Sequence, residues 1–269
     1  MIQADDTLRA AQAAVTTPTG YDEAMSQPTS GSPASRSGLR VAFFGGSFDP
    51  PHLGHLAVAR AAKAALELDT VLFAPVGAQP LKPQGATASF EDRVAMTRLA
   101  IAGEPGFAIS LADAPKPSGE PNFTLETLKE VRAALPAGSA LFCLMGADSF
   151  AGMQRWHRAA EVPFAAPLIV ASRPGQRLKG LKAMLPAGLR MEGQQGVEKT
   201  HAGIEVRTFS LVNAAGERTP LYLLPGLDVE ISASEIRAQL GTAPQDRSAE
   251  DALLPGGVAE YIRSHGLYR

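Results

Sequence analysis

The sequence predicts an α/β fold in which a doubly wound parallel sheet carries helices on both faces, followed by a small helical part at the C-terminus. Short apolar runs alternate along the chain with longer stretches that have the composition of helices, as expected for parallel strands joined by helical crossovers. Several of these runs end at a glycine or a proline, which is typical of a buried strand meeting a loop. The 269 residues, of which 45% are hydrophobic, are sufficient to bury a large core.

The individual elements follow from these runs in chain order. Strands are predicted over residues 39–44, 70–75, 107–111, 140–145, 167–171 and 221–224. Helices are predicted over residues 54–68, 90–102, 124–134, 156–161, 234–240 and 257–264. Ser89 is expected to cap the second of these helices, with Asp92 three residues further on.

Two parts of the chain differ from this pattern. Residues 1–38 are rich in Pro, Ser, Thr and Gly and poor in large apolar side chains, so we expect a disordered N-terminal extension, and Met25 is an alternative start. Residues 39–269 are predicted to form the folded domain. Within it, residues 174–220 hold several glycines and charged residues and are expected to be an irregular insertion.

The composition argues against several classes of protein. A formal net charge of −2 argues against a bulk polyanion such as a nucleic acid as the main partner. The single cysteine, Cys143, cannot form an internal disulfide, so a reducing, cytoplasmic setting is expected. No apolar run approaches the roughly 18 to 20 residues that span a bilayer. The N-terminal region, with Asp5 and Asp6, does not resemble a secretory signal, so no membrane partner is expected.

The most informative segment is residues 45–55, Gly-Gly-Ser-Phe-Asp-Pro-Pro-His-Leu-Gly-His, between the first predicted strand and the first predicted helix. In an open parallel sheet, ligands bind at this carboxyl edge of the strands. The helix start presents free N–H groups and the positive end of its dipole, which favour a phosphate. His52 and His55 are three residues apart, so their side chains can face one anion together. The alternative is a plain strand–helix turn whose histidines only cap the helix and contact solvent.

This segment resembles the His-x-Gly-His motif of a superfamily of nucleotidyltransferases, and the chain from about residue 40 onward resembles the bacterial nicotinate-nucleotide adenylyltransferases. The resemblance implies a Rossmann-like sheet of the nucleotidyltransferase type. Residues 230–237 resemble the family's Ile-Ser-Ser/Thr-x-x-Arg motif, although Ala233 interrupts the usual pair of hydroxyls. The residues that the resemblance implies for ATP binding are Gly46, Ser47, Phe48, His52, His55, Ser232, Ser234 and Arg237.

Three further segments resemble the part of the family that holds the mononucleotide. A Pro-rich loop after the second strand ends at Lys82, which is alternatively a solvated surface lysine. Phe123 and Thr124 match an aromatic-Thr motif, with Phe in place of the more usual Tyr, and Thr124 is alternatively a helix N-cap. Asp148, in a Gly-x-Asp-Ser motif, suits ribose hydroxyls. Trp156 suits stacking on a nicotinate ring, and is alternatively a core residue.

The resemblance implies transfer of the adenylyl group of ATP to nicotinate mononucleotide, giving nicotinate adenine dinucleotide and pyrophosphate in NAD biosynthesis. His52, His55 and Arg237 would be the catalytic residues. The attacking phosphate oxygen is already anionic at neutral pH, so catalysis reduces to alignment and charge neutralisation. Mg²⁺ is expected to accompany ATP through phosphate oxygens and water, and no residue is assigned as a metal ligand. The expected partners are ATP and nicotinate mononucleotide, and a homo-oligomer is compatible with the sequence.

Three alternatives stay open from the sequence. A related adenylyltransferase would act on nicotinamide mononucleotide, pantetheine phosphate or a flavin. An aminoacyl-tRNA synthetase also uses a His-x-Gly-His element, but this sequence has no Lys-Met-Ser-Lys-Ser segment and no basic bias. A non-catalytic nucleotide-binding protein would keep the same fold without the reaction.

Overall fold

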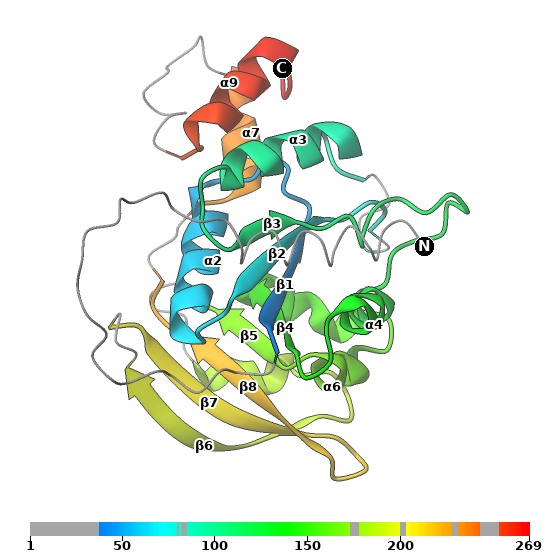
Figure 1. The fold of residues 1–269 in the computed structure, drawn as a ribbon, viewed down its shortest axis with the longest axis vertical. Helices are drawn as coiled ribbons and strands as arrows, with labels where there is room; N and C mark the ends of the chain where they lie inside the picture. Colours follow the sequence, from blue (N-terminus) through cyan, green and yellow to red (C-terminus); the bar gives the residue numbers. More distant parts are fainter. Residues whose placement is uncertain are drawn as a thin grey trace, which may run out of the picture.

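The computed structural model describes residues 38–79, 81, 85–172, 178–199, 203–227, 231–242 and 253–269. Within these residues the chain forms one eight-stranded, mostly parallel sheet with helices on both faces (Figure 1). The extension predicted over residues 1–38 falls almost entirely outside the described part of the chain. The predicted α/β fold class is confirmed.

The sheet has the order β3-β2-β1-β4-β5-β8-β7-β6. The chain moves outward from β1 to β3, then returns to place β4 against the other side of β1. At such a reversal of strand order the connections that leave two neighbouring strands run in opposite directions and leave a crevice outside the carboxyl ends of those strands. The strands are β1 (Arg40–Gly46), β2 (Thr70–Pro75), β3 (Phe107–Ile109), β4 (Ala140–Gly146), β5 (Leu168–Ala171), β6 (Arg190–Lys199), β7 (Glu205–Val212) and β8 (Arg218–Leu224).

Alternate residues of β1 supply the two cores of the sheet, because successive side chains of a strand point to opposite faces. Val41 and Phe43 pack into one core with α4, and Ala42 and Phe44 pack into the other with α2. Figure 1 shows α2 on one side of the sheet and α4 and α6 on the other. The α-helices are α2 (Leu53–Ala65), α3 (Phe90–Ile101), α4 (Thr124–Ala134), α5 (Ala147–Gly152), α6 (Val162–Ala165), α7 (Ala233–Thr242) and α9 (Gly256–His265).

The prediction of an irregular insertion at residues 174–220 is wrong for most of that segment. β6 and β7 form an antiparallel hairpin, and β7 pairs in turn with β8. β8 is parallel to β5 and continues the main sheet, so the hairpin covers what would otherwise be its free edge. β6 has irregular register near Gln194 and lies at the outer edge, where charged residues and glycines are compatible with a strand.

A predicted helix over residues 156–161 is also wrong. α5 begins earlier, directly after β4, and two short 3-10 turns at Met153–Arg155 and Ala159–Glu161 follow it. Arg158 interrupts the segment with a left-handed backbone, φ +50°. A new helix, α6, then begins with Pro163 in its first turn, where the missing N–H of proline costs no hydrogen bond.

The C-terminal helices α7 and α9 pack with α3 in a separate apolar cluster above β3 in the view of Figure 1. Ser89 caps α3, as predicted, and its hydroxyl oxygen accepts the N–H of Asp92 at 3.0 Å. This cluster holds α7 beside the loop that follows β1. In the described ranges, no helix combines the length and the apolar character needed to cross a bilayer.

The central strands should dominate stability. Leu72 in β2 is fully buried, so Leu72→Ala removes apolar burial and leaves a cavity, with an expected loss of about 2–5 kcal/mol in the free energy of unfolding. Leu99 on α3 is 41% exposed and provides the control, because Leu99→Ala should cost less than about 1 kcal/mol. Urea titrations followed by circular dichroism measure both. Equal losses in the two variants would contradict this assignment of the core.

Candidate active site

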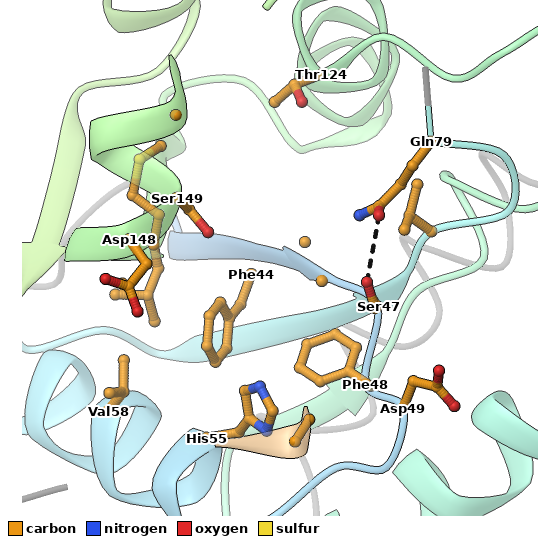
Figure 2. Close-up of a pocket in the computed structure, with 18 of the residues that line it drawn as sticks. Phe44, Ser47, Phe48, Asp49, His55, Val58, Gln79, Thr124, Asp148 and Ser149 are labelled. Carbon is orange, nitrogen blue, oxygen red and sulfur yellow. Dashed lines mark hydrogen bonds between the residues drawn. The ribbon is translucent and has the colours of Figure 1, made fainter. Parts of the chain in front are cut away.

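A cavity of about 750 Å³ lies at the carboxyl ends of β1 and β4, where the strand order reverses. Its walls come from the loop after β1, the start of α4, the start of α5 and the start of α7 (Figure 2). The structure brings together every predicted site residue that it describes. These are Gly46, Ser47, Phe48, His52, His55, Phe123, Thr124, Asp148, Trp156, Ser232, Ser234 and Arg237. Lys82 lies outside the described residues.

The two histidines lie at the start of α2. His52 is the N-cap residue and His55 is the third residue of the helix. Their ring centroids are 3.7 Å apart, and the backbone N–H of His52 donates to Nδ1 of His55 at 3.2 Å. An accepting Nδ1 carries no proton, so the neutral ring of His55 holds its proton on Nε2. The start of α2 therefore presents the Nε2–H of His55 as a donor, while the backbone N–H groups of Leu53 and His55 are already bonded to the carbonyls of Leu253 and His52.

The surroundings favour the neutral form of His55. Burial, and secondarily the neighbouring His52, lower the pKa of His55 well below its ordinary value of 6.5. Two protonated rings at this separation would repel each other in a partly desolvated site. A bound polyanion would act in the opposite direction and favour protonation of this pair.

Aromatic rings hold His55 in place. Its ring lies between Phe44 and Phe48, at centroid distances of 6.0 and 4.9 Å, as Figure 2 shows. Phe48 is buried with φ +46°, a backbone conformation that few side chains adopt. A Cβ added to Gly46 would lie 3.1 Å from the Phe48 ring, so glycine at this position lets the ring pack under the loop.

Arg237, on α7, reaches the loop after β1. Its guanidinium donates to the backbone oxygen of Asp49 at 2.6 Å and to the hydroxyl oxygen of Ser234 at 3.3 Å. α7 begins at Ala233, so Ser234 lies inside the first turn of the helix. The carbonyl of Ser232 accepts the N–H of Ile236 and begins the helix.

The opposite wall contains the residues predicted to hold a mononucleotide. α4 begins at Thr124 with Phe123 in the cap position, so the alternative of Thr124 as N-cap is wrong. The ring of Phe123 lies 4.5 Å from that of His157, centroid to centroid, with an angle of 35° between the ring planes, so the two rings pack against each other at this wall. Trp156 is half-buried, packs against the core of the α4 face and also lines the cavity, so the two interpretations of this residue are compatible. Asp148 lies in the first turn of α5.

Sequence reasoning missed Asp113 and Gln79. Asp113 follows β3, is 5% exposed and accepts a hydrogen bond from the Thr127 hydroxyl at 2.8 Å. Burial raises its pKa to about 6, although the Thr127 bond acts in the opposite direction. The Ser47 hydroxyl donates to the side-chain oxygen of Gln79 at 3.3 Å (Figure 2). Both residues follow strands at the carboxyl edge, and this position is the signal that could have identified them.

Comparisons with known proteins agree with this geometry. Residues 43–239, more than half of the chain, match the cytidylyltransferase-like family. Two relatives, from Gloeobacter violaceus and Stenotrophomonas maltophilia, carry the name "Probable nicotinate-nucleotide adenylyltransferase". The first is 36% identical over 233 residues and the second 38% over 235, and each alignment covers 86% of this chain and 97% of the relative.

The fold has a solved counterpart as well. A Plasmodium falciparum nicotinic acid mononucleotide adenylyltransferase, solved in complex with NaAD, superposes with a TM-score of 0.59 at 16% identity. The alignment covers 86% of this chain and 97% of that one, and it supports the fold. The chain is thus a nucleotidyltransferase of the cytidylyltransferase-like class. Within that class it belongs to the nicotinate-nucleotide adenylyltransferase family.

Because the pKa of Asp113 is raised, we expect the free energy of unfolding to depend on pH through this residue. The folded-state pKa of about 6 exceeds the ordinary value of 3.8, so the ionised carboxylate opposes folding at high pH and its protonation removes this cost as the pH falls. Asp113→Asn keeps an acceptor for Thr127 and should raise the free energy of unfolding at pH 8 by on the order of 2 kcal/mol. Near pH 4 the gain should be close to zero. Urea titrations at both pH values measure the difference, and a gain that does not depend on pH would contradict it.

Proposed function

We propose that the protein transfers the adenylyl group of ATP to nicotinate mononucleotide, giving nicotinate adenine dinucleotide and pyrophosphate in NAD biosynthesis. The observation that carries this proposal is the histidine pair at the start of α2, which lines the same cavity as the aromatic side chains of Phe123 and Trp156. One side of the cavity suits a polyphosphate and the other a ribotide with a flat ring. Two relatives that are at least 36% identical to this chain are named as nicotinate-nucleotide adenylyltransferases, and these names support the choice of substrates.

The triphosphate is proposed to lie across the start of α2. The positive end of the helix dipole favours a polyphosphate at this position, and Nε2–H of His55 supplies a donor for phosphate oxygens. Gly46, Ser47 and Phe48 form the loop beneath, Ser234 and Arg237 face it from α7, and Ser232 faces it from the residue before that helix. Arg237 is held 2.6 Å from the Asp49 carbonyl by its own hydrogen bond, at the edge of this cavity.

The mononucleotide is proposed to approach from the β4 side. Its ring would stack on Trp156 near Phe123 and Thr124, and Asp148 would accept hydrogen bonds from its ribose. Lys82 is retained as a phosphate contact of this subsite from the sequence alone. A phosphate oxygen of the mononucleotide attacks the α-phosphorus of ATP. The bond from that phosphorus to the bridging oxygen breaks, and pyrophosphate leaves with the electron pair.

The main barrier in this reaction is repulsion between two anions. His52, His55 and Arg237 would reduce that repulsion by donating to phosphate oxygens, and this interaction strengthens as charge builds on the leaving group. The nucleophile needs no general base because its oxygen is already ionised. Burial raises the pKa of the Cys143 thiol to about 12, so this residue stays protonated and does not compete as a nucleophile.

Mg²⁺ is proposed to enter with ATP. Across the described ranges, no three His, Cys, Asp or Glu residues are grouped to hold a metal ion. A cavity lined by single carboxylates such as Asp148 fits an ion that keeps phosphate oxygens and water as its ligands. When bound, it would neutralise part of the phosphate charge.

The setting of the reaction is also a proposal. A cytoplasmic location suits the free, buried Cys143. The formal net charge of −2 favours small nucleotides over a nucleic acid as partners.

Pyrophosphate release tests the substrate directly. The full chain with ATP and Mg²⁺ should release pyrophosphate rapidly with nicotinate mononucleotide, and much more slowly with nicotinamide mononucleotide, pantetheine phosphate or flavin mononucleotide. A higher kcat/KM with one of the other acceptors would replace the proposed substrate. Binding of ATP without release for any acceptor would favour a nucleotide sensor on the same fold.

His55 should matter more to turnover than to folding. His55→Ala removes the Nε2–H donor, and kcat/KM for ATP should fall by the equivalent of about 2–4 kcal/mol, as for one lost electrostatic donor. His265→Ala is the control, because His265 is exposed on α9 outside the cavity. A His55→Ala variant with near-native turnover would show that the imidazole has no such role.

A further inference from the structure

Asp49 connects segments that lie far apart in the sequence. It lies in the loop between β1 and α2 and is 4% exposed. One carboxylate oxygen accepts the N–H of Thr87 at 2.6 Å, and the other accepts the N–H of Ala88 at 3.0 Å and the hydroxyl of Tyr268 at 2.7 Å. The backbone carbonyl of the same residue accepts from Arg237 at 2.6 Å. None of the roles proposed above for the cavity residues involves this buried carboxylate.

Tyr268 reaches Asp49 through a defined turn. α9 ends at His265, and Gly266 follows with the left-handed conformation, φ +62°, that reverses the chain. The N–H of Leu267 bonds back to the carbonyl of Ile262 at 3.1 Å. Tyr268 itself has φ +65°, which is uncommon for a residue with a side chain. The backbone therefore adopts the left-handed conformation at Gly266 and again at Tyr268, and this path delivers one hydroxyl to a carboxylate 219 residues away in sequence.

The hydrogen bond between Tyr268 and Asp49 has more than a packing role, because other partners of Asp49 line the cavity. Thr87 belongs to a segment that lines the cavity, and Arg237 lines it from α7. Arg237 has few other anchors: a bond of 3.3 Å to Ser234 and a distance of 3.8 Å to the Asp49 carboxylate. If the loop backbone at Asp49 turned, the carbonyl that holds Arg237 would turn with it.

We propose that Tyr268 is a positioning residue for adenylyl transfer: its hydroxyl orients Asp49, which in turn fixes Arg237 and the segment at Thr87 at the edge of the cavity. The inference rests on the proposed role of Arg237 in binding the phosphates of ATP. Tyr268 does not line the cavity. Burial and the bond to Asp49 raise the pKa of the Tyr268 hydroxyl far above its ordinary value of 10, so it remains a donor at every physiological pH.

The neighbourhood of Asp49 carries a positive excess. Arg237 is 3.8 Å from the carboxylate, and the buried guanidinium of Arg93 donates to the carbonyl of Ser47 at 2.7 Å. The guanidinium groups of Arg237 and Arg93 thus lie near the carboxylate of Asp49, which belongs to the loop that carries the histidines. A carboxylate turned toward Arg237 would neutralise the cation meant for phosphate. The hydroxyl of Tyr268 and two backbone N–H groups occupy the carboxylate oxygens and keep the ion pair with Arg237 at 3.8 Å.

α9 offers a matched control for the experiment. The hydroxyl of Tyr261 also donates to a carboxylate on a neighbouring element, Asp92 of α3, at 2.9 Å. Tyr261→Phe and Tyr268→Phe each delete one hydroxyl that tethers the same helical cluster, and only the second of these hydroxyls reaches the cavity loop. A general loosening of the cluster would affect both variants equally.

The test compares steady-state kinetics, binding of a non-hydrolysable ATP analogue and urea unfolding of the full chain. Tyr268→Phe should lower kcat/KM for ATP about tenfold or more, the effect of one hydrogen bond to a charged group, and weaken analogue binding. KM for the mononucleotide should change less than about twofold, since that subsite lies on the β4 side. Tyr261→Phe should match the wild type in kinetics and should lose less free energy of unfolding than Tyr268→Phe, because Asp49 is 4% exposed and Asp92 is more accessible to solvent.

The pathway through Arg237 is tested by a double variant. In an Arg237→Ala background, Tyr268→Phe should have little further effect on analogue binding. An equal additional loss there, wild-type kinetics for Tyr268→Phe, or the same loss in Tyr261→Phe would each overturn the inference. A wild-type chain that binds the analogue but transfers no adenylyl group would instead overturn the proposed function, and the binding comparison would still decide the role of Tyr268.

Discussion

The contact between the carboxyl end of β1 and the start of α2 is the constraint on which the rest of the site depends. Because β4 returns to the other side of β1, the connections that leave the two strands run in opposite directions and the helix start faces the resulting crevice. The loop between them must turn within a few residues and still bury Phe48. Gly46 makes room for that ring, and the ring in turn fixes His55. The position of the imidazole pair is therefore set by packing beneath it.

Before a ligand binds, the basic side chains of the cavity are either neutral or already hydrogen-bonded. His55 is neutral because burial opposes its charge, and Arg237 is already engaged with the backbone of Asp49. Such a site attracts a polyanion mainly through oriented N–H groups, and it avoids a cluster of unpaired buried cations, which would destabilise the fold. Its positive charge increases when the phosphates arrive, since they favour protonation of the imidazoles. Asp113, on the opposite wall, adds one buried carboxyl whose charge depends on pH.

The sequence predicts strands β1 to β5, the last residues of β8 and most helices because their signals are local: apolar runs, glycine stops and a capping serine. The motif at residues 45–55 likewise located the histidines, since its spacing alone places both at a helix start. The hairpin of β6 and β7 was missed because its strands are stabilised by neighbours rather than by their own composition. The roles of Asp113 and Tyr268 were missed for a related reason, because each depends on a hydrogen bond to a residue distant in the chain. Arg158, with its left-handed backbone, interrupts a helix that composition favours.

The bond between Tyr268 and Asp49 has a consequence for folding during synthesis. The chain is made from its N-terminus, so β1, α2 and the loop between them emerge early, while the residue that completes the loop's buried carboxylate emerges after every strand. Until then the carboxylate lacks one of its donors, and the loop has one restraint fewer. Non-local closure of this kind is slow because the intervening chain must order first. The nascent sheet can therefore form well before its nucleotide site becomes competent.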